Sequence, residues 1–137
     1  MKVDNCRYCH RTTDIVEVVA DLEVATLYIV KDQAYKGRCI LALKEHKTEV
    51  FQLSADEMAA FGRDLSRSAK AIYAAFSPDK LNYAAFGDTY PHVHFHLVPK
   101  YKDGKSWGAP FELAPDPARE LPLAELQKLI AQIKDKL

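Results

Sequence analysis

Hydrophobic residues alternate with polar ones, or run together, along five short stretches of the chain, and this is typical of β-strands buried on one or both sides. Most of these stretches are rich in β-branched residues and are separated by breaks that contain glycine, proline or aspartate. The first two lie close enough to form a hairpin. The predicted strands are residues 15–20, 24–30, 38–43, 81–86 and 93–100.

A long amphipathic helix is predicted over residues 54–76. Ser54 and Glu57 have the spacing of a capping box, and Leu53 and Met58 have that of a hydrophobic staple. Apolar side chains then recur every three or four residues, which predicts one buried stripe made of Met58, Phe61, Leu65, Ala69, Ile72 and Phe76. The charged residues between them are expected on the solvated face, namely Arg63, Asp64, Arg67 and Lys70.

A second amphipathic helix is predicted near the C-terminus, over residues 121–133, after a proline-rich stretch that should be extended. Its apolar side carries Leu123, Leu126, Leu129, Ile130 and Ile133. Strands joined by short links and helices in separate blocks predict the α+β class. The expected fold is a five-stranded antiparallel sheet with one long central helix and a C-terminal helix.

Length and composition favour a single domain over residues 1–137, with residues 102–137 as a C-terminal extension and helix. The formal net charge is zero, so no basic excess favours a nucleic-acid partner. No apolar stretch resembles a secretory signal or a membrane span, which predicts a cytoplasmic protein without a membrane partner. Three cysteines in such a protein make a disulfide framework unexpected, and Cys39 is assigned to the core.

Three of the five histidines alternate with apolar residues over residues 92–96, with the period of a β-strand. His92, His94 and His96 therefore share one face, while Val93, Phe95 and Leu97 are expected on the core side. Such a row of imidazoles is open to three interpretations: a solvated strand face, a metal site, or a nucleophilic and acid–base site. The spacing alone does not separate the last two.

The N-terminus carries a second candidate site, the C-x-x-C pair Cys6 and Cys9, followed by His10. In a reducing compartment this spacing indicates metal or redox chemistry, and no βαβ unit follows that would favour redox. A closed zinc site needs two further ligands. His10 is a candidate ligand, although its position next to Cys9 makes joint tetrahedral binding awkward.

The stretch from His92 to Val98 resembles the signature of the histidine-triad (HIT) family, in which three histidines alternate with apolar residues. The asparagine-bearing segment 81–87 and the exit 99–101 are similar to the flanks of that signature, and the resemblance extends from Cys6 to about Tyr101. It implies a HIT-like fold, a homodimer, and a nucleotidyl hydrolase or transferase. Its substrate would be a nucleoside phosphoanhydride or phosphoramidate, such as a dinucleoside polyphosphate or an adenylated amine.

The resemblance also implies roles for the histidines. His94 would attack the α-phosphorus and form a nucleotidyl-histidine intermediate, while His92 and His96 would hold phosphate oxygens and help to move protons. No catalytic cofactor is expected. Some family members bind a structural zinc ion through a cysteine pair and two distant histidines, and the matching residues here are Cys6, Cys9, His46 and His92. With zinc bound, His92 would be structural and His96 would carry more of the chemistry.

Two further residues match substrate-binding positions of the family: Asn82 would lie at the phosphate, and Asp32 would accept hydrogen bonds from ribose hydroxyls. The short loop at Gly87, by its own chemistry, is expected to offer N–H groups to phosphate oxygens. Without such roles, Asp32 would bond its own turn and Asn82 would satisfy groups at a strand end.

Two departures from the family pattern bear on function. Arg38 stands where many members have a histidine, and the loop before the triad lacks the usual glutamine. A guanidinium stays protonated, so Arg38 does not replace a neutral histidine but is suited to contact phosphate. These departures leave open an alternative, a nucleotide-binding, zinc-stabilised interaction module without turnover. A metalloenzyme that uses His92, His94 and His96 as a facial ligand set is a third interpretation.

Overall fold

The computed structural model describes residues 1–137 and confirms the predicted α+β architecture. Its five strands are β1 (Val16–Asp21), β2 (Ala25–Val30), β3 (Cys39–Leu43), β4 (Lys80–Ala84) and β5 (His94–Lys100). They form one antiparallel sheet in the order β1-β2-β3-β5-β4. A short 3-10 helix (Val50–Gln52) precedes the long helix α1 (Ala55–Phe76), and α2 (Leu123–Lys136) ends the chain.

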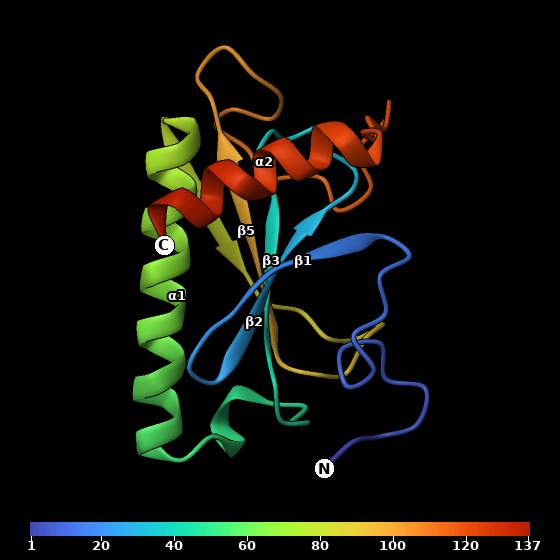
Figure 1. Cartoon of the computed structure of the whole chain (residues 1–137), viewed down its shortest axis with the longest axis vertical. Helices are drawn as coiled ribbons and strands as arrows, with labels where there is room; N and C mark the ends of the chain where they lie inside the picture. The colour runs from blue at the N-terminus through green and yellow to red at the C-terminus, as the bar shows by residue number, and fades with distance from the viewer.

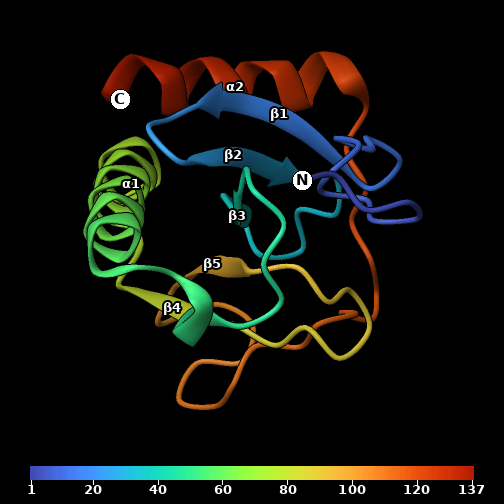
Figure 2. The ribbon, with the colours of Figure 1, turned by 90° about the horizontal axis from the view of Figure 1, so that it is seen from below.

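Both long helices cover the same face of the sheet. In Figures 1 and 2, α1 runs along one side of the sheet and α2 crosses it beside β1, so that the two helices meet at the C-terminus. The main hydrophobic core of 17 buried residues lies beneath them and includes Leu27, Leu41, Ile72, Leu97 and Ile133. No helix is long and apolar enough to span a bilayer.

The opposite face of the sheet is covered by segments without regular structure. Figure 2 shows the N-terminal loop and the loop between β4 and β5 gathered at one end of the strands, away from α1. A smaller cluster of six buried residues lies on this face and consists of Tyr8, Val16, Tyr28, Val30, Ile40 and Ala42. This face, which the helices leave free, carries the polar side chains of interest.

The N-terminal cap of α1 agrees with the sequence. The Ser54 hydroxyl accepts a hydrogen bond from the Glu57 backbone N–H, and the Glu57 carboxylate accepts one from the Ser54 backbone N–H. Two residues of this helix do not agree with the prediction. Met58, predicted in the buried stripe, is 38% exposed. Asp64 was expected on the solvated face but is buried, and its carboxylate accepts three backbone N–H bonds from Glu23, Val24 and Ala25. It fixes the β1–β2 turn onto the helix, a long-range role that helical periodicity does not reveal.

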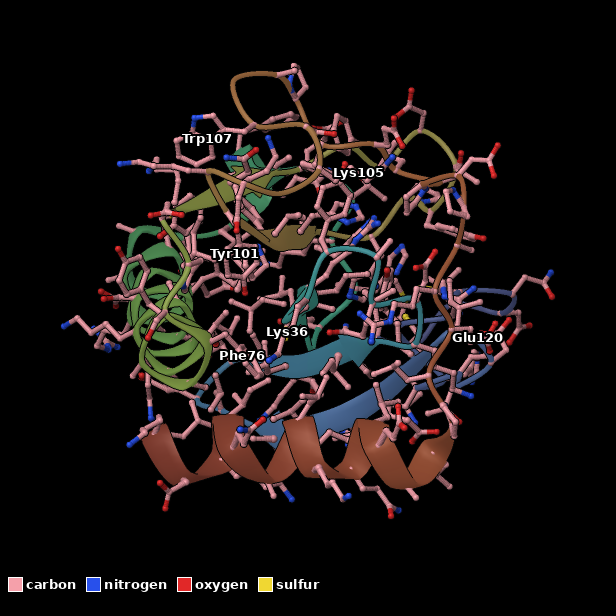
Figure 3. All side chains as sticks on the ribbon, turned by 90° about the horizontal axis from the view of Figure 1, so that it is seen from above. Lys36, Phe76, Tyr101, Lys105, Trp107 and Glu120 are labelled. Carbon is pink, nitrogen blue, oxygen red and sulfur yellow. The ribbon has the colours of Figure 1, made fainter.

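The segment after β5 crosses back over the sheet. In Figure 3 it turns at Lys105 and Trp107 and then passes Glu120 on its way to α2. Buried Lys100 holds the turn by donating to the carbonyls of Ser106 and Ala109. Further along, Asp32 and Glu120 form an isolated antiparallel bridge. Residues far apart in the sequence are thereby placed around one cavity.

Candidate functional site

A cavity of about 590 Å³ opens on the sheet face that the helices leave free. Its walls come from the N-terminal loop, the strands β3 and β5, the loop after β4, and the C-terminal segment. The lining residues with polar or aromatic side chains are Tyr8, Asp14, Lys31, Asp32, Arg38, Phe86, Asp88, Thr89, Tyr90, His94, His96 and Glu120. The size and the apolar wall with a few polar groups suit a small-molecule ligand.

His94, the first residue of β5, faces this cavity with a defined tautomer. Its Nδ1 lies 2.7 Å from the main-chain carbonyl oxygen of His92. A carbonyl only accepts hydrogen bonds, so Nδ1 carries the proton and Nε2 keeps its lone pair. Burial lowers the pKa of His94, so the neutral form dominates at neutral pH. The ring is therefore held as a nucleophile whose attacking nitrogen is free.

His96 lies beside His94 in a more apolar setting. Its ring is packed against Phe86, Phe111 and His94, with centroid distances of 5.7, 5.7 and 5.4 Å. Burial, with smaller contributions from His94 and Arg38, lowers the pKa of His96 to about 4. Its buried Nδ1 has no hydrogen-bond partner. A neutral imidazole with a free nitrogen is thus placed next to the nucleophile.

The expected row of three histidines is split in the structure. The strand begins at His94, and His92 lies in the bend before it, where its ring turns toward the cysteine loop instead of lining the cavity. His92 Nε2 is 2.6 Å from the carbonyl oxygen of Leu43 and so carries the proton, which leaves the lone pair on Nδ1. Alternation predicted a shared face only because it assumed that the strand extends through residue 92.

The four predicted metal ligands come together. The ligand atoms of Cys6, Cys9, His46 and His92 all lie within 4.8 Å of one another. His92 Nδ1 is 3.3 Å from the Cys6 sulfur and 3.1 Å from His46 Nδ1. Two thiols and two imidazoles, one of them with its lone pair aimed inward, fit the Cys₂His₂ set that zinc prefers. His10 is exposed and lies outside this group.

Asp32 and Gly87, two of the predicted substrate-binding residues, line the cavity. Asp32 accepts backbone bonds from Ala34 and Arg119, so it stabilises its own turn while it faces the cavity. Gly87 has φ of +113°, which favours glycine and shapes the loop beside the histidines. Asn82 does not join them: it lines a different hollow, with Lys100 and Trp107.

Arg38 also lines the cavity and is only 4% exposed. Its Nη1 donates to the carbonyls of Glu112 and Leu113 at 3.4 and 3.1 Å, and its guanidinium lies 5.4 Å from the centre of the Phe111 ring. Its Nε is buried without a partner. Burial lowers the pKa of Arg38, yet a guanidinium remains charged. The cavity therefore contains a buried cation whose hydrogen bonds go only to carbonyls.

Several cavity residues were not assigned to a site from the sequence. Tyr8 comes from the cysteine loop, Phe86 and Tyr90 from the loop before β5, and Leu113, Ala114 and Glu120 from the C-terminal segment. Tyr8 sits between two predicted metal ligands, which is the one signal that pointed to its surroundings. Phe86 was predicted as the last residue of the fourth strand, with no role in a site, and the others lie in segments without periodicity. No pattern in the sequence therefore placed them here.

Comparison with known proteins gives one family. The HIT domain family profile matches residues 15–103. The curated relative "Protein hit" of Bacillus subtilis (strain 168) is 24% identical over 136 residues, with 94% of each chain covered. A histidine triad protein from Bradyrhizobium japonicum superposes with a TM-score of 0.83 at 23% identity, over 92% of this chain and 93% of the other. A Zn-bound histidine triad family protein from Mycobacterium smegmatis gives 0.67 at 17% identity, over 96% and 92%.

Proposed function

The chain belongs to the HIT domain family, and from this premise we propose that it is a nucleotidyl hydrolase or transferase that cleaves a nucleoside phosphoanhydride or phosphoramidate. The observation that carries the proposal is the state of His94: Nδ1–H bonded to a carbonyl, and Nε2 free in a cavity of suitable size. A dinucleoside polyphosphate and an adenylated amine both present the required α-phosphorus.

The proposed reaction has two steps that share one nucleophile. His94 Nε2 forms a bond to the α-phosphorus as the bond to the leaving group breaks, and the leaving group takes up a proton from water. In the resulting nucleotidyl-imidazolium, Nδ1–H still donates its hydrogen bond to the His92 carbonyl, which stabilises the charge, and the cationic ring is a good leaving group in turn. Water then attacks the phosphorus, and the nucleoside monophosphate leaves neutral His94 behind.

The neighbouring groups suit the charge that develops. Arg38 supplies a buried positive charge, and such charges stabilise phosphoryl oxygens strongly where water is excluded. His96 is neutral and lies beside His94, and its one ring N–H can donate a hydrogen bond to a phosphate oxygen or to the leaving group. Asp32 is assigned to the ribose and the Gly87 loop to phosphate oxygens, while Asn82, which lies in another hollow, is assigned at most an indirect part.

We also propose a structural zinc ion at Cys6, Cys9, His46 and His92, since these donors converge and the related protein from Mycobacterium smegmatis is described as Zn-bound. When bound, zinc would tie the N-terminal loop to the sheet, and His92 would have a structural role. Elemental analysis of the purified chain should give one zinc per chain. Cys6→Ser should lose it, and His10→Ala, a matched change at the exposed neighbouring histidine, should retain it.

Product analysis tests the activity. The purified protein is mixed with an adenosine phosphoramidate and, separately, with a diadenosine polyphosphate, with His94→Ala alongside. We expect monophosphate release by the native chain alone and a transient nucleotidyl adduct in its intact mass. Full activity in His94→Ala would contradict the assignment of His94 as the nucleophile.

A second candidate function is a nucleotide-binding module without turnover. It is favoured by Arg38, which replaces a histidine common in the family and is tied to two main-chain carbonyls. Tight binding of nucleotide with no product from either substrate would support this candidate. The same experiment therefore separates the two.

A further inference from the structure

The metal cluster and the nucleophile are joined by two separate connections. One is the main chain of His92, whose ring belongs to the cluster and whose carbonyl accepts the Nδ1 proton of His94. The other is Tyr8, which lies between Cys6 and Cys9 and lines the cavity. Neither connection is explained by a metal ion that only stabilises the fold at a distance.

Tyr8 packs directly on the nucleophile. Its ring centroid is 4.6 Å from that of His94, with an interplanar angle of 32°, and 5.5 Å from that of His92. Tyr28 supports it from behind at 6.0 Å, and Tyr8 is only 6% exposed. With one face against Tyr8 and Nδ1 on a carbonyl, the His94 ring is restrained in both tilt and rotation.

The loop that carries Tyr8 is attached to the rest of the protein by side chains and not by backbone hydrogen bonds. All backbone hydrogen bonds of residues 3–12 stay within that segment: Cys6 to Val3, His10 to Cys6, Arg11 to Tyr8 and Thr12 to Arg7. The body of the protein is reached through side chains: the four metal-ligand candidates, the Arg11–Asp21 ion pair, and the packing of Tyr8 against the smaller hydrophobic cluster. A metal ion that joins Cys6 and Cys9 to His46 and His92 would therefore fix the position of Tyr8.

We propose that Tyr8 positions the nucleophile His94 and that, through Tyr8 and the His92 carbonyl, metal binding at the cluster and nucleotide binding in the cavity strengthen each other. This rests on the proposed function. Both ligands order the same loop, so the first to bind bears the entropic cost and the second binds more tightly. Linkage then requires that each ligand raises the affinity of the other by one common factor.

The direct test measures zinc affinity by competition with a chromophoric chelator, in the presence and absence of AMP. AMP should raise the zinc affinity of the native chain about 5- to 50-fold, and zinc should raise the AMP affinity by the same factor. Tyr8→Phe keeps the ring and should keep the factor. Tyr8→Ala should still bind one zinc ion, but the factor by which AMP raises its zinc affinity should fall toward 1.

The zinc-loaded enzyme gives a second measurement that does not depend on the stability of the zinc-free chain. Tyr8→Ala should lower kcat about 10- to 100-fold with KM changed less than threefold, as expected for loss of positioning around a reacting group. Tyr8→Phe should restore kcat. A purely structural role would instead lower the active fraction and leave kcat per active site as it is.

Equal zinc affinity with and without AMP in a native chain that turns over substrate overturns the coupling alone and leaves the proposed function intact. Full coupling in Tyr8→Ala overturns the role of Tyr8. If the native chain binds no nucleotide with or without zinc, both the inference and the proposed function are wrong.

Discussion

At the scale of single residues, the burial of His96 has a consequence for stability. Its pKa is lowered to about 4 in the folded chain, mainly by burial, against about 6.5 when unfolded. Between these values the unfolded chain binds more protons at this site, so the free energy of unfolding falls as the pH falls from 6.5 to 4. The loss should be roughly 2–3 kcal/mol at this residue.

The measurement is urea unfolding of the native chain and His96→Asn at pH 7.5, 5.5 and 4.5. Asparagine does not titrate, so the variant should lose less stability on acidification than the native chain. The difference between the two curves isolates His96 from other groups that titrate in the same range. Parallel curves would show that His96 is not held neutral by its surroundings.

Arg38 combines two tasks that substitutions separate. Its Nη1 anchors the C-terminal segment through Glu112 and Leu113, and its charge faces the cavity. Arg38→Gln keeps a donor for the carbonyls but removes the charge, and Arg38→Lys keeps the charge. If the charge holds phosphate, Arg38→Gln should lower kcat/KM about 10- to 100-fold, roughly 1.4–2.7 kcal/mol, and Arg38→Lys should recover part of it.

Steady-state kinetics with both substrates checks this expectation, with Lys128→Ala on the exposed side of α2 as a control. Equal kinetics for Arg38→Gln and the native chain would assign Arg38 to the anchoring of the segment alone.

At the scale of elements, Asp64 joins α1 to the β1–β2 turn. Its carboxylate accepts three backbone N–H groups, and the two oxygens share them. Asp64→Asn turns one oxygen into an amide nitrogen that faces these donors. We expect a loss of about 2–3 kcal/mol in the free energy of unfolding, since bonds to a charged acceptor contribute about 1.5–3 kcal/mol each.

Chemical denaturation checks this value, and the matched control is Asp56→Asn. Asp56 is exposed in the first turn of the same helix, so its change should stay within about 0.5 kcal/mol. Equal effects at the two positions would contradict the bonding assigned to Asp64.

The elements themselves were readable from the sequence because their signals are local. Apolar residues that repeat every two positions predicted the strands, and apolar residues that repeat every three or four positions predicted both long helices. The capping box placed the start of α1. Errors fell at the ends: the fourth strand stops at Ala84 rather than Phe86, and the fifth starts at His94 rather than Val93. The second helix runs to Lys136, three residues beyond the predicted end.

The candidate site was readable in part, for the same reason. The cluster of Cys6, Cys9, His46 and His92 was implied by family resemblance, and its ligand atoms converge. The wall made by residues 111–120 was not foreseen, because it depends on long-range bonds such as Arg119 to Asp32. The contact of Tyr8 with His94 likewise needs the folded loop.

At the scale of the whole molecule, a free edge and an apolar hollow are a candidate surface for the homodimer that the family resemblance implies. Strand β4 is at the edge of the sheet. Beside it, a hollow between β4 and α1 is lined by Leu65, Ala69, Tyr73, Leu81 and Tyr83 among others, and both tyrosines are about half exposed. An unpaired edge next to exposed aromatic side chains favours pairing with another copy.

Tyr83→Glu tests this arrangement, because a two-fold axis along β4 would bring the two glutamates close together in an apolar setting. We expect the native chain to sediment as a dimer and Tyr83→Glu as a monomer at tens of micromolar, with Leu123→Glu, on the far end of α2, remaining dimeric. Activity per chain should survive in monomeric Tyr83→Glu, since neither Tyr83 nor the other residues of the hollow beside β4 line the histidine cavity. A native chain that sediments as a monomer would show that there is no homodimer. A dimeric Tyr83→Glu would place the interface elsewhere. A monomeric Tyr83→Glu without activity would mean that the second copy supports the cavity through α1 and β4.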